Sequence, residues 1–148
     1  MIENKLVEKL KEKKYKISFA ESCTGGLLAS TIINVSGSSN VIEESYITYS
    51  ENAKMKLLNV KKETLDKYTV YSKEVALEMA KGLKDKTNSN VCVSVTGIAQ
   101  SDDVCKCYYC IIINDETLIK EYNTKGSRNE VRINYTNQIL EEIYKNLA

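Results

Sequence analysis

Apolar residues recur at helical spacing in three segments of the chain. In residues 3–14 and 72–86, apolar side chains stand three or four positions apart among Lys and Glu, which predicts two amphipathic helices. Ser72 stands where the N-cap of the second helix is expected. From Ser127 to Leu147 the same periodicity predicts a C-terminal helix.

Short runs of β-branched and aromatic residues predict the strands. Residues 15–20, 45–50 and 91–99 form such runs, and CYYCIIIND followed by ETLIKEYNT predicts a hairpin that turns at Asn114-Asp115. A helix starting near Thr24 and another over 51–58 follow the first two strands. Since helices stand before, between and after the strands, we expect a single α/β domain over residues 1–148, a three-layer α/β/α sandwich with a mixed sheet.

Charge and hydropathy limit the expected partners. The chain has 20 acidic and 21 basic residues, and its Lys residues are spread over several segments, so we expect no nucleic-acid partner. The N-terminus is charged throughout, and no apolar run approaches the roughly 20 residues that span a bilayer. We therefore expect a soluble, cytoplasmic protein with no membrane contact.

Cysteine and histidine content narrows the chemistry further. The absence of His excludes a Ser-His-Asp triad and any imidazole zinc site. Cys105, Cys107 and Cys110 could suggest a metal or redox cluster, but strand alternation directs the first two to one face and Cys110 to the other. We interpret the five Cys as free core thiols and expect no bound metal.

Three places along the chain have polar residues that could carry chemistry. Where the first predicted strand ends, ESCTGG could offer backbone N–H groups to an anion, although Ser22 or Thr24 could equally cap a helix. Ser39, Tyr49 and Lys54 could form a nucleophile with a neutral Lys base, or be ordinary turn and surface residues. Arg128, at the start of the last helix, could hold a phosphate or be solvated.

Taken together, the segments resemble the CinA C-terminal domain family, which includes bacterial nicotinamide mononucleotide deamidases. The resemblance covers nearly the whole chain and keeps the order of the family's motifs. It is carried by AESCTGGLLAS, GSS, YITYSENAKMKLLNVKKETL, VYSKEVALEMAKG (where the family has a Val-Ser-x-Glu-Val-Ala-like segment) and VSVTGIA.

The resemblance implies a metal-free serine amidohydrolase that converts nicotinamide mononucleotide to nicotinic acid mononucleotide and ammonia in pyridine nucleotide salvage. The expected ligand is thus a small pyridine nucleotide, with no cofactor. By motif position, Ser39 corresponds to the nucleophile, Lys54 to the general base and Tyr49 to a side chain beside them that can relay or orient the proton.

The same comparison assigns expected substrate contacts. Ser22 and Thr96 match polar residues that line the site, with Thr96 as a possible oxyanion donor. Arg128 matches the loop expected to bind the phosphate. A second possible anion site is the helix start at Thr24, Gly25 and Gly26.

One departure from the family leaves other functions open. After Thr96-Gly97-Ile98-Ala99 the family's Gly- and Pro-rich loop is missing, and Asp102 and Asp103 take its place. A catalytically degenerate nucleotide-binding or interaction module is therefore an alternative, as is an amidase or esterase with another substrate. We also expect a homo-oligomer, because the hairpin edge at 107–123 offers unpaired strand groups.

Overall fold

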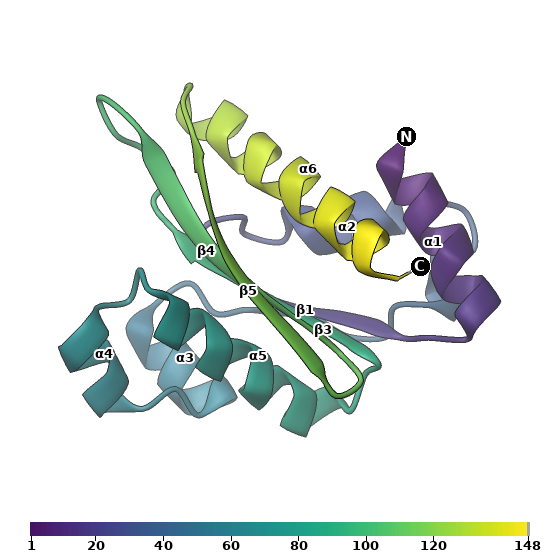
Figure 1. Ribbon diagram of the computed structural model, residues 1–148, viewed down its shortest axis with the longest axis horizontal. Coiled ribbons are helices and arrows are strands. Elements are labelled where there is room, and N and C mark those ends of the chain that lie inside the picture. The colour runs from purple at the N-terminus through teal and green to yellow at the C-terminus, as the bar shows by residue number, and fades with distance from the viewer. Residues whose placement is uncertain (148) are drawn as a thin grey trace.

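Five strands form one mixed sheet between two layers of helices in the computed structural model, which describes residues 1–147 (Figure 1). The strand order is β2-β1-β3-β4-β5; β1 pairs in parallel with β2 and β3, whereas β4 is antiparallel to both of its neighbours. This confirms the predicted α/β/α sandwich. The strands are β1 (Ile17–Glu21), β2 (Tyr46–Ile47), β3 (Val91–Gly97), β4 (Cys105–Ile113) and β5 (Glu116–Thr124).

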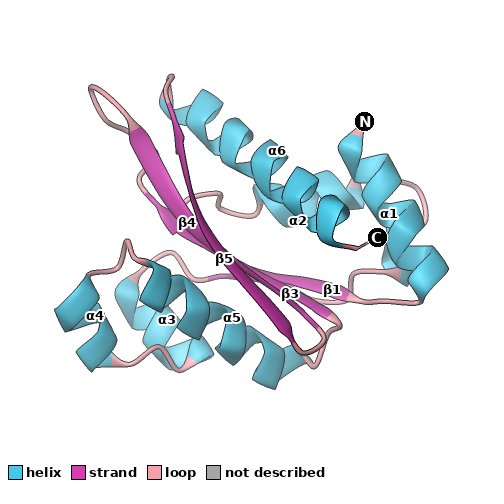
Figure 2. Ribbon diagram, in the orientation of Figure 1, coloured by secondary structure: helices cyan, strands magenta, loops and turns pink. Residues whose placement is uncertain are grey.

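The helices divide between the two faces of the sheet (Figure 2). One face carries α1 (Ile2–Lys13), α2 (Leu27–Ile33) and α6 (Arg128–Asn146), and the other carries α3 (Glu51–Leu58), α4 (Lys62–Tyr68) and α5 (Lys73–Thr87). Helix α4 was not predicted. Helix α2 begins at Leu27 and not near Thr24, because Gly25 and Gly26 have positive φ angles, 58° and 99°, that an α-helix excludes.

Strand alternation builds a separate apolar core on each face. On β3, Val91, Val93 and Val95 face the α1/α2/α6 layer, while Cys92 faces the α5 layer. The cysteines of β4 follow the same rule, as predicted: Cys105 and Cys107 belong to the first core and Cys110 to the second. All five thiols are free and buried.

Serine side chains cap the starts of three helices. Ser72 accepts a hydrogen bond from the Val75 N–H at 3.2 Å, which confirms it as the cap of α5. Ser127 and Glu130 form a reciprocal capping box at the start of α6. Ser50 likewise caps α3, the helix that carries Lys54.

Close packing of α5 fixes the position of α3. A Cβ atom added to Gly82 would lie 1.9 Å from the Leu58 carbonyl oxygen, so only glycine permits this approach of the two helices. The C-terminal end of α3 is thereby held against α5, and α5 in turn packs on β3 and β4. The helix bearing Lys54 therefore has a fixed position relative to the sheet.

The chain leaves β1 and β3 in opposite directions. After β1 it runs through α2 to β2 on one side, whereas after β3 it turns to β4 on the other side. In open α/β sheets, ligands bind in the crevice at the carboxyl ends of such diverging strands. The topology thus predicts a ligand site beside the segments that follow Glu21 and Gly97.

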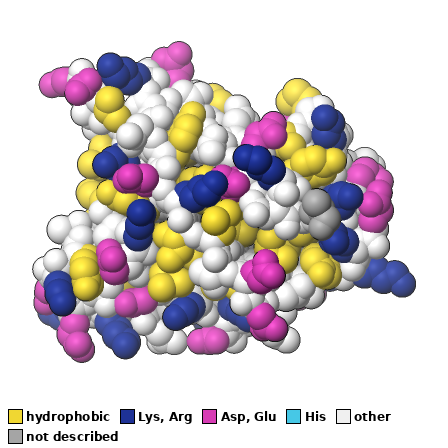
Figure 3. All heavy atoms as spheres, in the orientation of Figure 1, with side chains coloured by type: hydrophobic (Ala, Val, Ile, Leu, Met, Phe, Trp, Pro, Cys, Tyr) yellow, Lys and Arg dark blue, Asp and Glu magenta, His cyan; other side chains and the backbone are white. Residues whose placement is uncertain are grey.

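The visible surface mixes both signs of charge. In Figure 3, Lys and Arg side chains are interspersed with Asp and Glu around apolar patches, without a single basic stripe. None of the helices formed by residues 1–147 has the length and apolar character required to cross a membrane.

Thr69 adopts a backbone conformation, φ 69° and ψ 165°, that is otherwise restricted to glycine. Replacing it by glycine is expected to raise the free energy of unfolding by about 1 kcal/mol, because the relieved strain exceeds the entropy cost of glycine. Urea denaturation measures this change. Thr117→Gly in the exposed edge strand β5 is the matched control and should destabilise; a loss of stability in both variants would contradict the prediction.

Candidate functional site

A cleft of about 530 Å³ opens at the carboxyl ends of β1 and β3. Its floor holds Ser22, which follows β1, and Lys54, the fourth residue of α3. The segment after β3 and the first residue of α6 close it from the other side. Its lining consists of Ser22, Cys23, Tyr49, Ser50, Glu51, Lys54, Val70, Tyr71, Gly97, Ile98, Ala99, Gln100 and Arg128.

Lys54 lies fully buried with its amine against Ser22. Its Nζ donates to Ser22 Oγ at 2.9 Å, to the Thr48 carbonyl at 2.8 Å and to the Tyr49 carbonyl at 3.3 Å. No carboxylate is among these hydrogen-bond partners. A cation in this position has lost water and gained only neutral acceptors, which disfavours its protonated form.

Burial lowers the pKa of Lys54 to about 8, against weaker opposing effects from Cys23 and Glu51. A useful fraction of the amine is therefore neutral near physiological pH. The neighbouring thiol behaves in the opposite way, since burial raises the pKa of Cys23 to about 12. Cys23 remains protonated, and the hydroxyl of Ser22 is the group in hydrogen-bond contact with the base.

The expected pair of Ser39 and Lys54 is not formed. Ser39 lies in the 3₁₀ turn Ser38–Asn40, which leads directly to Val41, whose carbonyl accepts from the N–H of Ile17 at the start of β1. Ser22 follows the opposite end of β1. Because β1 has five residues, the length of this strand separates the two serines by on the order of 16 Å along the sheet. Ser39 lines a different hollow, with Ile33 and Glu43 among its neighbours.

The prediction that the Gly-containing turn after β1 is open to an anion is wrong. The buried carboxylate of Glu21 accepts from the N–H groups of Gly26, Leu28 and Ala29 at 3.2, 2.9 and 3.0 Å. The start of α2 is thus already occupied by an acidic group. Thr24, Gly25 and Gly26 do not line the cleft, and Thr24 is completely buried.

Thr96 also has a different position from the one expected. Its hydroxyl is buried and donates to the Val70 carbonyl at 2.9 Å, so it is not directed toward Ser22 as an oxyanion donor. The bond instead ties β3 to the segment before α5. That segment presents Tyr71 at the mouth of the cleft.

Arg128 bridges the rim of the cleft. It donates from Nη2 to the Tyr49 hydroxyl at 3.0 Å and from Nη1 to Gln100 Oε1 at 3.2 Å. The Tyr49 side chain is thus directed to Arg128, and only its carbonyl contacts Lys54. Asp103 pairs with Lys125 at 3.5 Å, and neither Asp102 nor Asp103 lines the cleft, so these carboxylates do not face an anion bound there.

The sequence analysis missed two residues of the cleft and one pairing within it. Tyr71 and Gln100 stand in segments between predicted elements, where no pattern indicated their direction. Ser22 was recognised as a lining residue but not as the partner of Lys54. The signal available was its place directly after a buried strand and before a Gly-Gly turn.

The fold and cleft together define a doubly wound α/β/α domain with a buried Ser-Lys contact at its topological switch point. The CinA C-terminal domain family matches residues 1–147, and the chain belongs to this family.

Curated and structural relatives agree with this assignment. A Clostridium botulinum protein described as competence-damage inducible is 41% identical over 152 residues, covering 99% of this chain but 37% of the relative. The chain therefore spans little more than a third of that relative. A CinA-like protein of Petrotoga mobilis is 40% identical over 137 residues, covering 88% of the chain and 34% of that protein.

Two crystal structures show the same architecture. The competence or damage-inducible protein of Enterobacter asburiae superimposes with a TM-score of 0.94 at 25% identity, covering 99% of this chain and 96% of that chain. The competence/damage inducible protein CihA of Agrobacterium tumefaciens gives 0.87 at 30% identity, with 96% and 91% covered.

The buried amine of Lys54 makes stability depend on pH. Folding lowers its pKa from 10.5 to about 8, so between these values the unfolded chain binds more protons and the free energy of unfolding rises with pH. Relative to Lys54→Met, which cannot titrate, wild-type stability should rise by about 1–3 kcal/mol across this window. Urea denaturation of both proteins at several pH values measures it; a constant difference would contradict a buried, shifted amine.

Proposed function

We propose that the protein is a metal-free serine amidohydrolase that deamidates nicotinamide mononucleotide, with Ser22 as nucleophile and Lys54 as general base. The observation that carries the proposal is the 2.9 Å contact between Ser22 Oγ and a buried amine with a pKa lowered to about 8. The family supports the choice of substrate class, and the cleft supports the mechanism.

The hydrogen bonds of Lys54 orient its lone pair. A neutral amine has two N–H donors and one lone pair, and the carbonyls of Thr48 and Tyr49 can only accept. When both N–H groups are given to these carbonyls, the lone pair remains for the Ser22 hydroxyl, which then donates to Nζ. The arrangement therefore activates the hydroxyl of Ser22 without His or a metal.

Proton transfer and bond cleavage balance through Lys54. Ser22 Oγ attacks the carboxamide carbon as its proton passes to Nζ, and the resulting ammonium gives that proton to the leaving nitrogen as the C–N bond breaks. Ammonia departs and an acyl-Ser22 ester remains. Water then attacks the ester with Lys54 as base, which releases nicotinic acid mononucleotide and restores the hydroxyl. The backbone N–H of Cys23, directly after the nucleophile, is the proposed oxyanion donor.

The rim supplies the substrate contacts. Arg128 is the basic residue of the rim and is proposed to bind the phosphate of the nucleotide. Tyr49, Tyr71 and Ile98 are 60%, 45% and 40% exposed around the mouth, an apolar surface that suits a flat heteroaromatic ring. The polar floor and the apolar mouth thus fit the two ends of an aromatic carboxamide.

Ammonia release from nicotinamide mononucleotide by chelator-treated protein, with product identification by mass spectrometry, tests the activity. Ser22→Ala and Lys54→Met should each lower kcat by about 10³-fold or more, because each removes one member of the pair. The rate should increase with pH and level off above about 8, since the base must be neutral.

Ser39→Ala is the matched control and should retain wild-type turnover, because Ser39 lies at the other end of β1. Loss of activity in Ser39→Ala with retention in Ser22→Ala would reverse the assignment. Binding of the mononucleotide without ammonia release by the wild-type protein would instead support a nucleotide-binding module.

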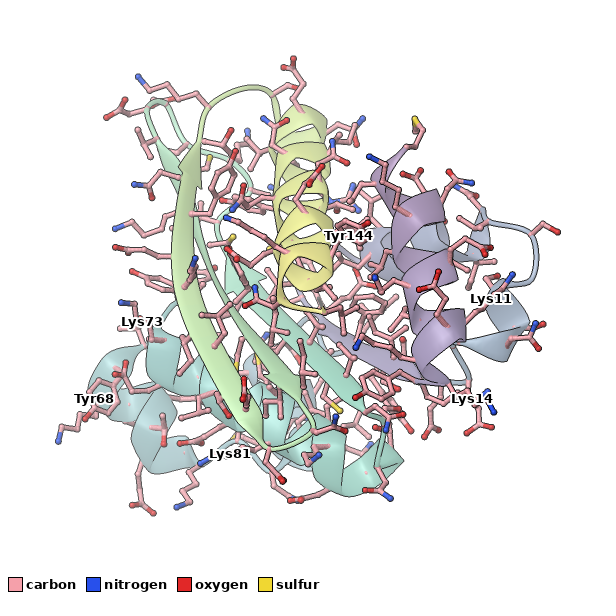
Figure 4. All side chains as sticks on the ribbon, turned by 45° about the vertical axis from the view of Figure 1, so that its right-hand side comes forward. Lys11, Lys14, Tyr68, Lys73, Lys81 and Tyr144 are labelled. Atoms are coloured by element: carbon pink, nitrogen blue, oxygen red, sulfur yellow. The ribbon has the colours of Figure 1, made fainter. Side chains whose placement is uncertain are left out.

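Tyr71 is expected to contribute to binding of the pyridine ring. Tyr71→Val should raise KM by about tenfold with little change in kcat, whereas Tyr71→Phe keeps the ring and should resemble wild type. Tyr68→Val is the control, because Tyr68 is 41% exposed at the end of α4, on the outside of the molecule (Figure 4), and does not line the cleft. Steady-state kinetics decide; an unchanged KM in Tyr71→Val would refute the contact.

A further inference from the structure

The turn that carries Ser22 is held by two side chains of opposite charge. Residues 22–26 connect β1 to α2 without regular structure, and Ser22 is the first of them. Glu21 and Arg132 both contact this turn or the helix start that follows it, yet neither lines the cleft. Both charges also act on the pKa of Cys23, which Glu21 raises and Arg132 lowers, so both lie close to the residue after Ser22.

Glu21 fixes the far end of the turn by accepting hydrogen bonds from backbone N–H groups there. The carboxylate is 1% exposed and accepts from Gly26, Leu28 and Ala29. Glu21 is the last residue of β1, so the same residue is bound to the sheet by its backbone and to α2 by its side chain. The chain between these two anchors is therefore short and closed.

Arg132 fixes the middle of the turn by donating hydrogen bonds to backbone carbonyl groups of the turn. It donates from Nε to the Cys23 carbonyl at 3.0 Å and from Nη2 to the Thr24 carbonyl at 2.7 Å. These are two charge-assisted hydrogen bonds from one planar group, which a Lys side chain cannot reproduce. A Cβ atom on Gly25 would lie 3.2 Å from Nη2, so the glycine at this position leaves room for the guanidinium.

The guanidinium reaches the turn from the other end of the chain. Arg132 belongs to α6, which contacts α2 on the same face of the sheet (Figure 1). It stands one helical turn after Arg128, the rim residue. One helix therefore presents two arginines to the same region, one at the mouth of the cleft and one behind its wall.

We propose that Arg132, together with Glu21, is a positioning residue that holds the turn so that Ser22 Oγ stays in hydrogen-bond contact with Lys54 Nζ. The inference rests on the proposed role of Ser22 as nucleophile. Because Lys54 is fixed separately by the carbonyls of Thr48 and Tyr49, a shift of the turn separates the two groups without moving the base. Displacement of a reacting group by about 1 Å can cost about 10²-fold in rate.

Kinetics of paired arginine variants separate positioning from substrate binding. Arg132→Lys should lower kcat by about 10²-fold with KM within about twofold, because the cleft lining is intact. Arg128→Lys should do the reverse, raising KM with a smaller effect on kcat, since it removes a paired contact to the phosphate. Guanidinium ion, well below denaturing concentrations, should restore part of the activity of Arg132→Ala, and methylammonium should not.

Hydrogen exchange of the peptide covering residues 20–29 reports on the turn independently of turnover. Exchange should become faster there in Arg132→Lys and remain unchanged in Arg128→Lys, with similar melting temperatures for both. Faster exchange without loss of kcat would reduce Arg132 to a structural role and overturn the proposal. Unchanged exchange would overturn it as well.

The two hypotheses fail in different ways. If wild-type protein releases no ammonia, the proposed amidase activity and the proposed positioning of a nucleophile are both contradicted. Hydrogen exchange alone then decides whether Arg132 holds the turn. If wild-type protein is active and Arg132→Lys is equally active, only the positioning role is lost.

Discussion

The burial of the Lys54 amine is the constraint on which the site depends. An ammonium ion without a carboxylate partner is costly in a dry environment, and the structure meets that cost with three neutral oxygen acceptors. Two of these are carbonyls of the chain between β2 and α3, so the acceptors belong to the segment that leads into the helix bearing the lysine. The third is Ser22, which links this unit to β1. The strands, the capped start of α3 and the close contact at Gly82 all maintain this geometry.

The topology explains why these groups meet although they are far apart in sequence. Ser22 follows β1, Lys54 follows β2 and Gly97 ends β3, and the three strands are parallel, so their carboxyl ends share one edge of the sheet. Arg128 and Arg132 then arrive from α6, after the antiparallel hairpin has returned the chain to this edge. The connection after β3 supplies Gln100 to the rim and lines the cleft on that side.

Local patterns predicted the elements well and the site only in part. The amphipathic periodicity of residues 72–86, the cap at Ser72 and the Asn114-Asp115 turn are local features, and the structure confirms them. The Ser39 and Lys54 pairing failed because motif order along the chain does not show which end of a strand a loop occupies. The predictions for Thr24 to Gly26 and for Thr96 failed for a related reason. The sequence shows which groups can donate a hydrogen bond, but not that the Glu21 carboxylate already accepts from Gly26 or that the Val70 carbonyl already accepts from Thr96.

The bridge from Arg128 to Tyr49 and Gln100 has a consequence for recognition at the rim. A free arginine side chain carries about 2 kcal/mol of rotamer entropy, which an anion must suppress when it binds. Here two neutral acceptors from separate loops already hold the guanidinium over the cleft, so this part of the ordering cost is met when the chain folds. The rim is in this sense preorganised, and an incoming anion exchanges neutral hydrogen-bond partners for a charged one without first having to immobilise the arginine.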